Sequence, residues 1–165
     1  MNELKKSLKI YINKHLKENK RLEKKCFHSF IFAEESDFET PNTIVDFLNT
    51  HKEDKDFQSL LFQYIDKKNL KDADVYNKVH IDRRLFSKIR SDKDYHPSKE
   101  TVILLGIALE LKEEELDLLL ESASYSLPKN NPYDLIIRFC FIHKIFKLQD
   151  INNLLEDYHC KLFHY

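Results

Sequence analysis

The chain has 165 residues, of which 42% are hydrophobic and 33% charged, so it can bury one sizeable core. A single glycine and four prolines argue against an antiparallel β protein, whose hairpins need glycine, and predict an all-α fold. The net charge of −1 lacks the basic surplus that is typical of a dedicated nucleic-acid-binding domain. Without a run of about 18 apolar residues or a secretory signal, we expect a cytoplasmic protein with no membrane span.

Residues 2 to about 24 have the pattern of an amphipathic helix. The apolar stripe consists of Leu4, Leu8, Tyr11, Ile12, His15 and Leu16. The opposite face is basic, since nine basic and only three acidic residues lie between positions 3 and 25. A helix of this kind suits a DNA backbone, a membrane surface, a second copy, or docking onto the rest of the chain. The sequence leaves these roles open.

The next segment connects this arm to the rest of the chain. Residues 26–33 are too short a run to assign, and a strand and a buried helix end both fit them. Thr40-Pro41 predicts a helix from 41 to about 50, because threonine caps a helix and proline suits its first position. Residues 51–56 are all polar, which indicates a linker and a boundary near 54. Residues 1–54 therefore form the first of three predicted units.

Two short helices separated by a tight corner follow a first scaffold helix that begins at Phe57. Helical spacing predicts the first over 70–79, and His80-Ile81 closes the corner. Asp82 is a good N-cap for the second helix, over 83–90. In this second helix the apolar face consists of Leu85, Phe86 and Ile89, and the polar face of Arg84, Ser87, Lys88 and Ser91. One face can enter a core while the other meets a groove.

Two more scaffold helices follow, and charge is distributed unevenly over this region. Pro97-Ser98 predicts a helix start, and a leucine-rich helix ends near Glu121. Residues 78–99 carry seven basic and three acidic residues, whereas residues 110–121 carry six acidic and one basic residue. We therefore expect a positive surface on the second corner helix and a negative one on the last scaffold helix.

The C-terminal part is predicted to add two helices and an apolar tail. Asn131-Pro132 starts a strongly apolar helix, and Ile151, Leu154 and Leu155 indicate a last one. The tail, 158–165, should dock on this chain or on a second copy. The expected units are thus an arm with a bridging segment over 1–54, a central domain over 55–127 and a helical extension over 128–165.

Residues 70–116 resemble the XRE (Cro/CI-like repressor) helix-turn-helix family. The resemblance rests on Val79-His80-Ile81-Asp82-Arg83, Phe86-Ser87-Lys88-Ile89 and His96-Pro97-Ser98-Lys99-Glu100-Thr101. Leu85–Ser91 and Asp94–Lys99 look most like a little-characterised bacterial branch, and the resemblance extends from Phe57 to about Leu155. It implies a Cro/CI-repressor-like helix-turn-helix bundle of bacterial or phage origin, with a helical N-terminal arm and a C-terminal helical pair. The chain departs from the family at His80, which is usually glycine, and at Lys71-Asp72, which is often Thr-Gln.

The resemblance implies a dimeric, sequence-specific transcriptional regulator that binds double-stranded DNA. The expected major-groove residues are Arg83, Arg84, Ser87 and Lys88, and the expected phosphate contacts are Lys71, Lys78, Arg90 and Lys93. A solvated helix face is the plain alternative for these charges. The apolar stripe of the arm and the Leu162-Phe163 tail predict a homodimer, because they exceed what one monomeric unit needs.

A second hypothesis treats the helix-turn-helix as a scaffold. The chain would then be a protein-interaction module, such as an adaptor, an antitoxin-like protein or a phage-conflict factor, that binds a protein through the arm or the tail. Neutral charge, His80 and Asp72 favour this interpretation. The chain has no Walker loop, GxGxxG or nucleophile elbow, so we expect neither an enzyme nor a cofactor. We expect no metal either, because His159 and Cys160, although they could join Cys140 and His143 around zinc, are adjacent and chelate poorly.

Overall fold

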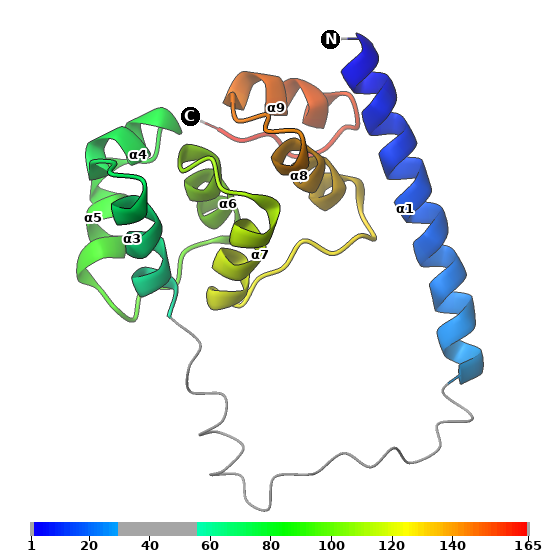
Figure 1. The fold of residues 1–165 in the computed structure, drawn as a ribbon, viewed down its shortest axis with the longest axis horizontal. Coiled ribbons are helices and arrows are strands. Elements are labelled where there is room, and N and C mark those ends of the chain that lie inside the picture. The colour runs from blue at the N-terminus through cyan, green and yellow to red at the C-terminus, as the bar shows by residue number, and fades with distance from the viewer. Residues whose placement is uncertain (1, 30–55, 165) are drawn as a thin grey trace, which may run out of the picture.

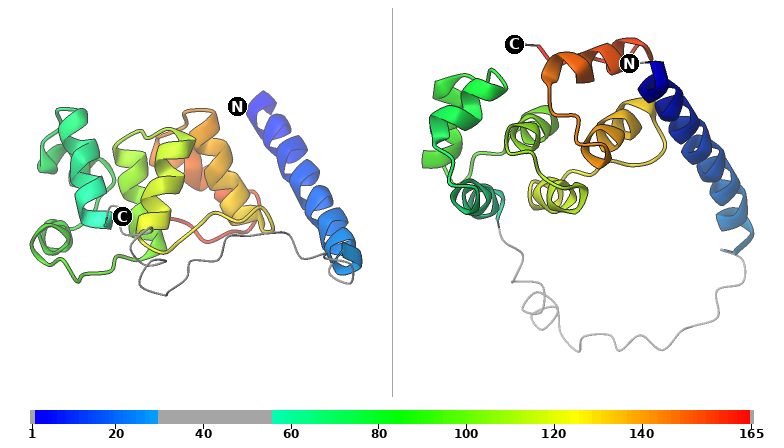
Figure 2. Two further views of the ribbon diagram at one scale, coloured as in Figure 1. Left: turned by 60° about the horizontal axis from the view of Figure 1, so that its bottom comes forward. Right: turned by 45° about the horizontal axis from the view of Figure 1, so that its top comes forward.

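A computed structural model describes the backbone of residues 2–29 and 56–164, and the side chains of residues 3–20 and 56–164. These residues form eight helices and no β-strand, which confirms the all-α class. Figure 1 shows α3, α4 and α5 at one end, α6 and α7 in the middle, α8 and α9 next, and α1 at the other end. The two views in Figure 2 show the same order. None of the described helices combines the length and the apolar composition that a bilayer span requires.

The N-terminal helix is longer than its apolar pattern predicts. Helix α1 spans Asn2–Ser29, so it passes the expected end near residue 24 and includes residues 26–29 of the segment left unassigned. Residues 30–33, the helix expected from 41 to about 50 and the linker up to residue 55 lie outside the described residues.

Helices α3 (Phe57–Lys67), α4 (Asp72–Lys78) and α5 (Arg83–Ser91) form one end of the molecule. Asp56 caps α3, because its carboxylate accepts the Ser59 amide at 2.9 Å. Helix α4 begins two residues later than predicted. The reason is local: the Leu70 amide donates to the Ile65 carbonyl at 3.2 Å, so Leu70 completes the end of α3.

Helices α6 (Lys99–Ala108) and α7 (Glu113–Ser122) form the middle layer. Ser98 caps α6 as predicted, with its hydroxyl accepting the Thr101 amide at 3.2 Å. Gly106 allows the two helices to approach closely. A Cβ at this position would lie 2.7 Å from Leu116 Cδ1 and 3.3 Å from the ring of Phe141, and both of those side chains are buried.

Helices α8 (Pro132–Ile142) and α9 (Leu148–Glu156) pack beside this layer. Asn131 caps α8 as predicted, and its side chain accepts the Asp134 amide at 2.9 Å. The C-terminal tail docks on its own chain, since Phe163 is only 3% exposed. Asn152 holds it by donating to the Phe163 carbonyl and accepting from the Phe163 amide, both at 3.0 Å.

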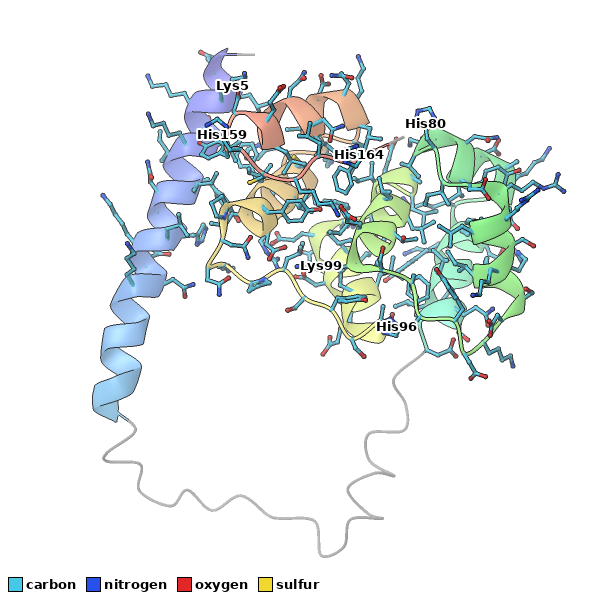
Figure 3. The ribbon with its side chains drawn as sticks, turned by 180° about the vertical axis from the view of Figure 1, so that it is seen from behind. Lys5, His80, His96, Lys99, His159 and His164 are labelled. Atoms are coloured by element: carbon cyan, nitrogen blue, oxygen red, sulfur yellow. The ribbon has the colours of Figure 1, made fainter. Side chains whose placement is uncertain are left out.

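The apolar stripe of α1 is covered by α8. Leu8 and Ile12 are 0% and 3% exposed, and the Tyr11 ring lies 5.6 Å from the ring of Phe139. An ion pair of 2.7 Å joins Lys5 to Asp157, at the junction with the end of α9 where Figure 3 shows Lys5 and His159. Leu8, Ile12 and Phe163 thus pack within the chain, so the apolar ends do not require a second copy to cover them. The homodimer stays a prediction, but the apolar stripe and the tail no longer argue for it.

A single hydrophobic cluster runs through the described helices. It contains buried residues from α1 and from each of α3 to α9, with the tail residue Phe163. Leu127, at the expected boundary before residue 128, is itself buried at 3% exposure. The cluster passes through this boundary without a break, and the three-part division stays a prediction.

Six of the described helices end in the same way, which the sequence does not predict. Each is followed by a non-glycine residue with φ between 48° and 59°, namely Asn69, His80, Glu110, Ser124, Lys144 and His159. The next residue, usually apolar, donates its amide to the carbonyl five positions back at 2.8–3.2 Å. These are Schellman motifs, which glycine normally closes because it has no Cβ to strain the left-handed conformation.

We expect Ser124→Gly to raise the free energy of unfolding by about 0.5–1 kcal/mol, because it removes the left-handed strain at φ 59° on an exposed residue. Ser124→Ala is the matched control and should give no gain, since alanine keeps the Cβ. Urea unfolding followed by circular dichroism measures both. Equal stability of the two variants would contradict the strain argument.

Candidate nucleic-acid interface

Helix α5 has a capped start and one largely buried face. Asp82 caps it, with its carboxylate accepting the amides of Arg84 at 2.7 Å and Leu85 at 3.4 Å. Phe86 and Ile89 are each 2% exposed and face the core. The predicted inward position is therefore confirmed for Phe86 and Ile89, whereas Leu85, the third residue predicted on this face, is half-buried.

The opposite face of α5 is exposed. It carries the four residues predicted for the major groove, Arg83, Arg84, Ser87 and Lys88. Within residues 56–164 and the described part of α1, no hydrogen bond or ion pair engages the side chain of Arg83 or Arg84. The Lys88 ammonium lies 4.6 Å from the centre of the Tyr95 ring, so this lysine is held towards the loop after α5 by a cation–π contact.

The corner between α4 and α5 is closed by the left-handed residue His80, at φ 55°. The Ile81 amide donates to the Tyr76 carbonyl at 2.9 Å, and Ile81 is 8% exposed. Val79 is also buried, at 1% exposure. The corner therefore forms without glycine, and the buried side chains on either side of His80 anchor it. Figure 3 shows His80 at the end of the molecule far from Lys5.

The C-terminal end of α5 is clamped by two other helices. From α3, the Gln58 side chain donates to the carbonyls of Ile89 at 2.8 Å and Arg90 at 2.6 Å. From α4, Asp72 pairs with Arg90 at 2.5 Å. The Arg90 guanidinium also lies 4.0 Å from the centre of the Phe62 ring. These contacts fix the direction of α5 relative to α3 and α4.

The four residues predicted to contact phosphates fall into two groups. Lys71 and Lys93 are exposed, and no described residue pairs with either side chain. Arg90 is engaged as above, and Lys78 pairs with Glu110 at 2.5 Å. The structure thus brings the major-groove set together on one helix face, but gives Lys78 and Arg90 carboxylate partners. Sequence reasoning missed Gln58, Phe62 and Tyr95, because their contacts join distant positions and leave no local signal.

The predicted acidic surface on α7 is partly neutralised. Glu113 and Asp117 pair with Arg138 of α8, at 2.5 and 2.8 Å. Glu115 pairs with Lys67 at 3.3 Å, and hydrogen bonds from Lys112 and Lys67 lower its pKa although burial opposes this. The expected negative surface on the last scaffold helix is therefore weaker than the sequence implies, since most of its carboxylates bind cations of neighbouring helices.

The described residues contain no metal-ligating cluster, and their buried titratable side chains belong to the core. No group of three or more metal-ligating side chains occurs among the described residues. Cys140 is fully buried, and burial raises the pKa of its thiol to about 12, so it remains a protonated core residue. Burial raises the pKa of Tyr133 as well, with Glu100 and Asp134 adding to the effect. Its hydroxyl has no hydrogen-bond partner in the described part of the chain.

Comparison with known proteins finds no family model, no curated protein and no solved structure that matches this chain.

Proposed function

We propose that this chain is a sequence-specific double-stranded DNA-binding regulator, in which α4 and α5 act as a helix-turn-helix of the XRE type. The observation that carries the proposal is the two-sided character of α5. Its apolar face is buried, while Arg83 and Arg84 are exposed and have no partner within the described residues. Two arginines that leave their hydrogen-bond donors unused on a rigid, capped helix suit recognition of base edges.

The roles of the other residues follow from their contacts. Ser87 and Lys88 share the exposed face of α5 with the arginines. Lys71, just before α4, and Lys93, in the loop after α5, are exposed, and we assign them to phosphate contacts. Lys78 pairs with Glu110 and Arg90 pairs with Asp72, so each can bind a phosphate only after it releases that carboxylate. We therefore assign Arg90, together with Gln58, to positioning α5. A regulator of this kind acts in the cytoplasm.

A protein-interaction module remains the second candidate. The Asp72–Arg90 pair favours it, because a carboxylate at the start of α4 repels phosphate and occupies one of the nearest arginines. The near-neutral net charge of the chain points the same way. The protein partner in this hypothesis would bind through the arm or the tail, and its binding would not depend on base sequence.

Arg84→Ala tests direct readout. We expect selection from a random duplex library to give a preferred sequence with the native chain, and the variant to lose about 1–3 kcal/mol of discrimination at one base pair. Folding should be unaffected, because Arg84 is exposed and makes no described side-chain contact.

The control is Lys129→Gln, which removes one exposed charge from the loop before α8. It should leave the preferred sequence unchanged. A native chain that selects no sequence, or a variant with the same preference as the native chain, would overturn the direct-readout role of α5.

A further inference from the structure

The exposed face of α1 is a second basic surface that the proposed role of α5 does not use. It consists of Lys6, Lys9, Lys17 and Lys20, with Lys14 at its edge, and is called the lysine face below. These positions repeat at helical spacing opposite the buried stripe. None of the five lysines has a hydrogen bond or an ion pair with a described residue. Among the described acidic residues of α1, Glu18 lies 3.5 Å from His15 and Glu3 stands near the N-terminal end.

The burial of α1 decides which anionic partner this face suits. An interfacial membrane helix needs an apolar face to insert below the headgroups. Here Leu8 and Ile12 of that face are already packed against α8, at 0% and 3% exposure. Ile10 alone is a large exposed hydrophobic residue among the described side chains of α1, at 63%. Charge therefore dominates the outer face, and a single isoleucine gives too little apolar area to insert below headgroups, so the face matches a phosphate backbone better than a membrane surface.

The length of the lysine face also fits a duplex. From Lys6 to Lys20 a helix rises about 21 Å, which is the length of roughly six base-pair steps. Asn13 lies between the two pairs of lysines on this face and is exposed, and Ile10, four residues after Lys6, is the one bulky apolar side chain that stands among the described lysines. Several phosphates can therefore be neutralised at once along one helix.

The place of α1 in the fold separates this surface from α5. Figures 1 and 2 show α1 and α5 at opposite ends of the molecule, with α6 to α9 between them. A duplex seated on α5 thus lies across the body of the molecule from the lysine face. We propose that the lysine face of α1 binds the phosphate backbone of a second duplex segment, so that one chain bridges two duplexes. The bridging rests on the proposed function of α5, whereas the phosphate binding of α1 does not.

A capture assay tests the proposal. A 30-base-pair duplex is fixed to beads, the full chain is added, and retention of a second, fluorescent duplex is measured across a salt series. The test variant carries Lys9→Gln, Lys17→Gln and Lys20→Gln, which change exposed side chains without described partners. The matched control carries Lys129→Gln, Lys144→Gln and Lys147→Gln, which remove the same charge from exposed positions around α8 and α9.

We expect the native chain and the control to retain the second duplex, and the α1 variant to retain at least about tenfold less. The slope of log affinity against log salt should fall in magnitude by about three for the α1 variant, because each phosphate contact contributes about 0.9. Equal retention and equal slope for the two triple variants would overturn the proposal. Lysine-dependent binding to anionic phospholipid vesicles or to an oligoglutamate peptide, with none to duplex, would overturn it too.

The double variant Arg83→Ala, Arg84→Ala separates this proposal from the function proposed for α5. If sequence preference survives in that variant, the role of α5 fails. The loss of salt slope in the α1 variant would still support phosphate binding by α1.

Discussion

Phe86→Ala is expected to lower the free energy of unfolding by about 3–5 kcal/mol. Phe86 is 2% exposed, and its ring packs against the rings of Tyr76 at 5.5 Å and Phe62 at 6.3 Å. The substitution therefore removes the centre of an aromatic cluster that joins α3, α4 and α5, and leaves a cavity. For a chain of this size the melting temperature should fall by roughly 6–20 °C.

Two further variants make the Phe86 measurement decisive. Leu118→Ala removes a large apolar side chain that is 54% exposed, and should change the stability by less than about 0.5 kcal/mol. Phe86→Leu keeps most of the volume, should lose less than Phe86→Ala, and remains measurable if the alanine variant does not fold. A melting temperature of Phe86→Ala within about 3 °C of the native value would show that α5 does not bury this face.

The starts of α5, α6 and α8 could be predicted from the sequence because capping is local chemistry. Asp82, Ser98 and Asn131 each accept an amide two or three residues ahead, so residue type and position suffice to find them. The ends could not be predicted equally well. The left-handed residues after the helices include glutamate, lysine and serine, which have no preference for this conformation, and tertiary packing of the apolar residue that follows holds most of them there.

The candidate site shows the same division between local and distant information. Exposure of Arg83 and Arg84 follows from helical periodicity, because the apolar face of α5 must be buried. The partners of Arg90 and Lys78 lie 18 and 32 positions away, and no spacing rule links such residues. The role of Gln58 depends on a contact across 31 positions. Helix α5, which carries the candidate site, could be predicted from the sequence, whereas the contacts that fix its direction could not.

The docking of the two ends depended on the same kind of information. The sequence predicts that the apolar stripe of α1 and the tail must each pack against another surface, and both do. The sequence could not show that the partner is the chain itself, because α8 supplies one surface and Asn152 of α9 the other.

Arg138→Met is expected to lower the free energy of unfolding by about 2–3 kcal/mol. From α8, Arg138 binds two carboxylates of α7, with Nη1 at 2.5 Å from Glu113 and 2.8 Å from Asp117. Its Nη2 donates to Asp117 at 3.0 Å and to the Leu127 carbonyl at 3.1 Å. Burial by itself lowers the pKa of Arg138, but the hydrogen bonds to Asp117 and Glu113 raise that pKa above its ordinary value. The guanidinium therefore stays charged, and it closes the contact between α7 and α8.

The size of the loss follows from the exposure of each partner. The Arg138 side chain is 11% exposed, whereas Glu113 and Asp117 are 30% and 43% exposed. Removing one member of a fully buried pair costs about 3–5 kcal/mol, and water around these two carboxylates reduces that figure.

Lys67→Met is the matched control, since Lys67 also pairs with α7 through Glu115 but is 67% exposed, and it should cost less than about 1 kcal/mol. Adding Glu113→Gln and Asp117→Asn to Arg138→Met should restore part of the stability, because no unpaired carboxylate is then left at the contact. Urea unfolding of the four proteins measures these differences, and equal losses for Arg138→Met and Lys67→Met would show that α7 and α8 are held together by apolar packing alone.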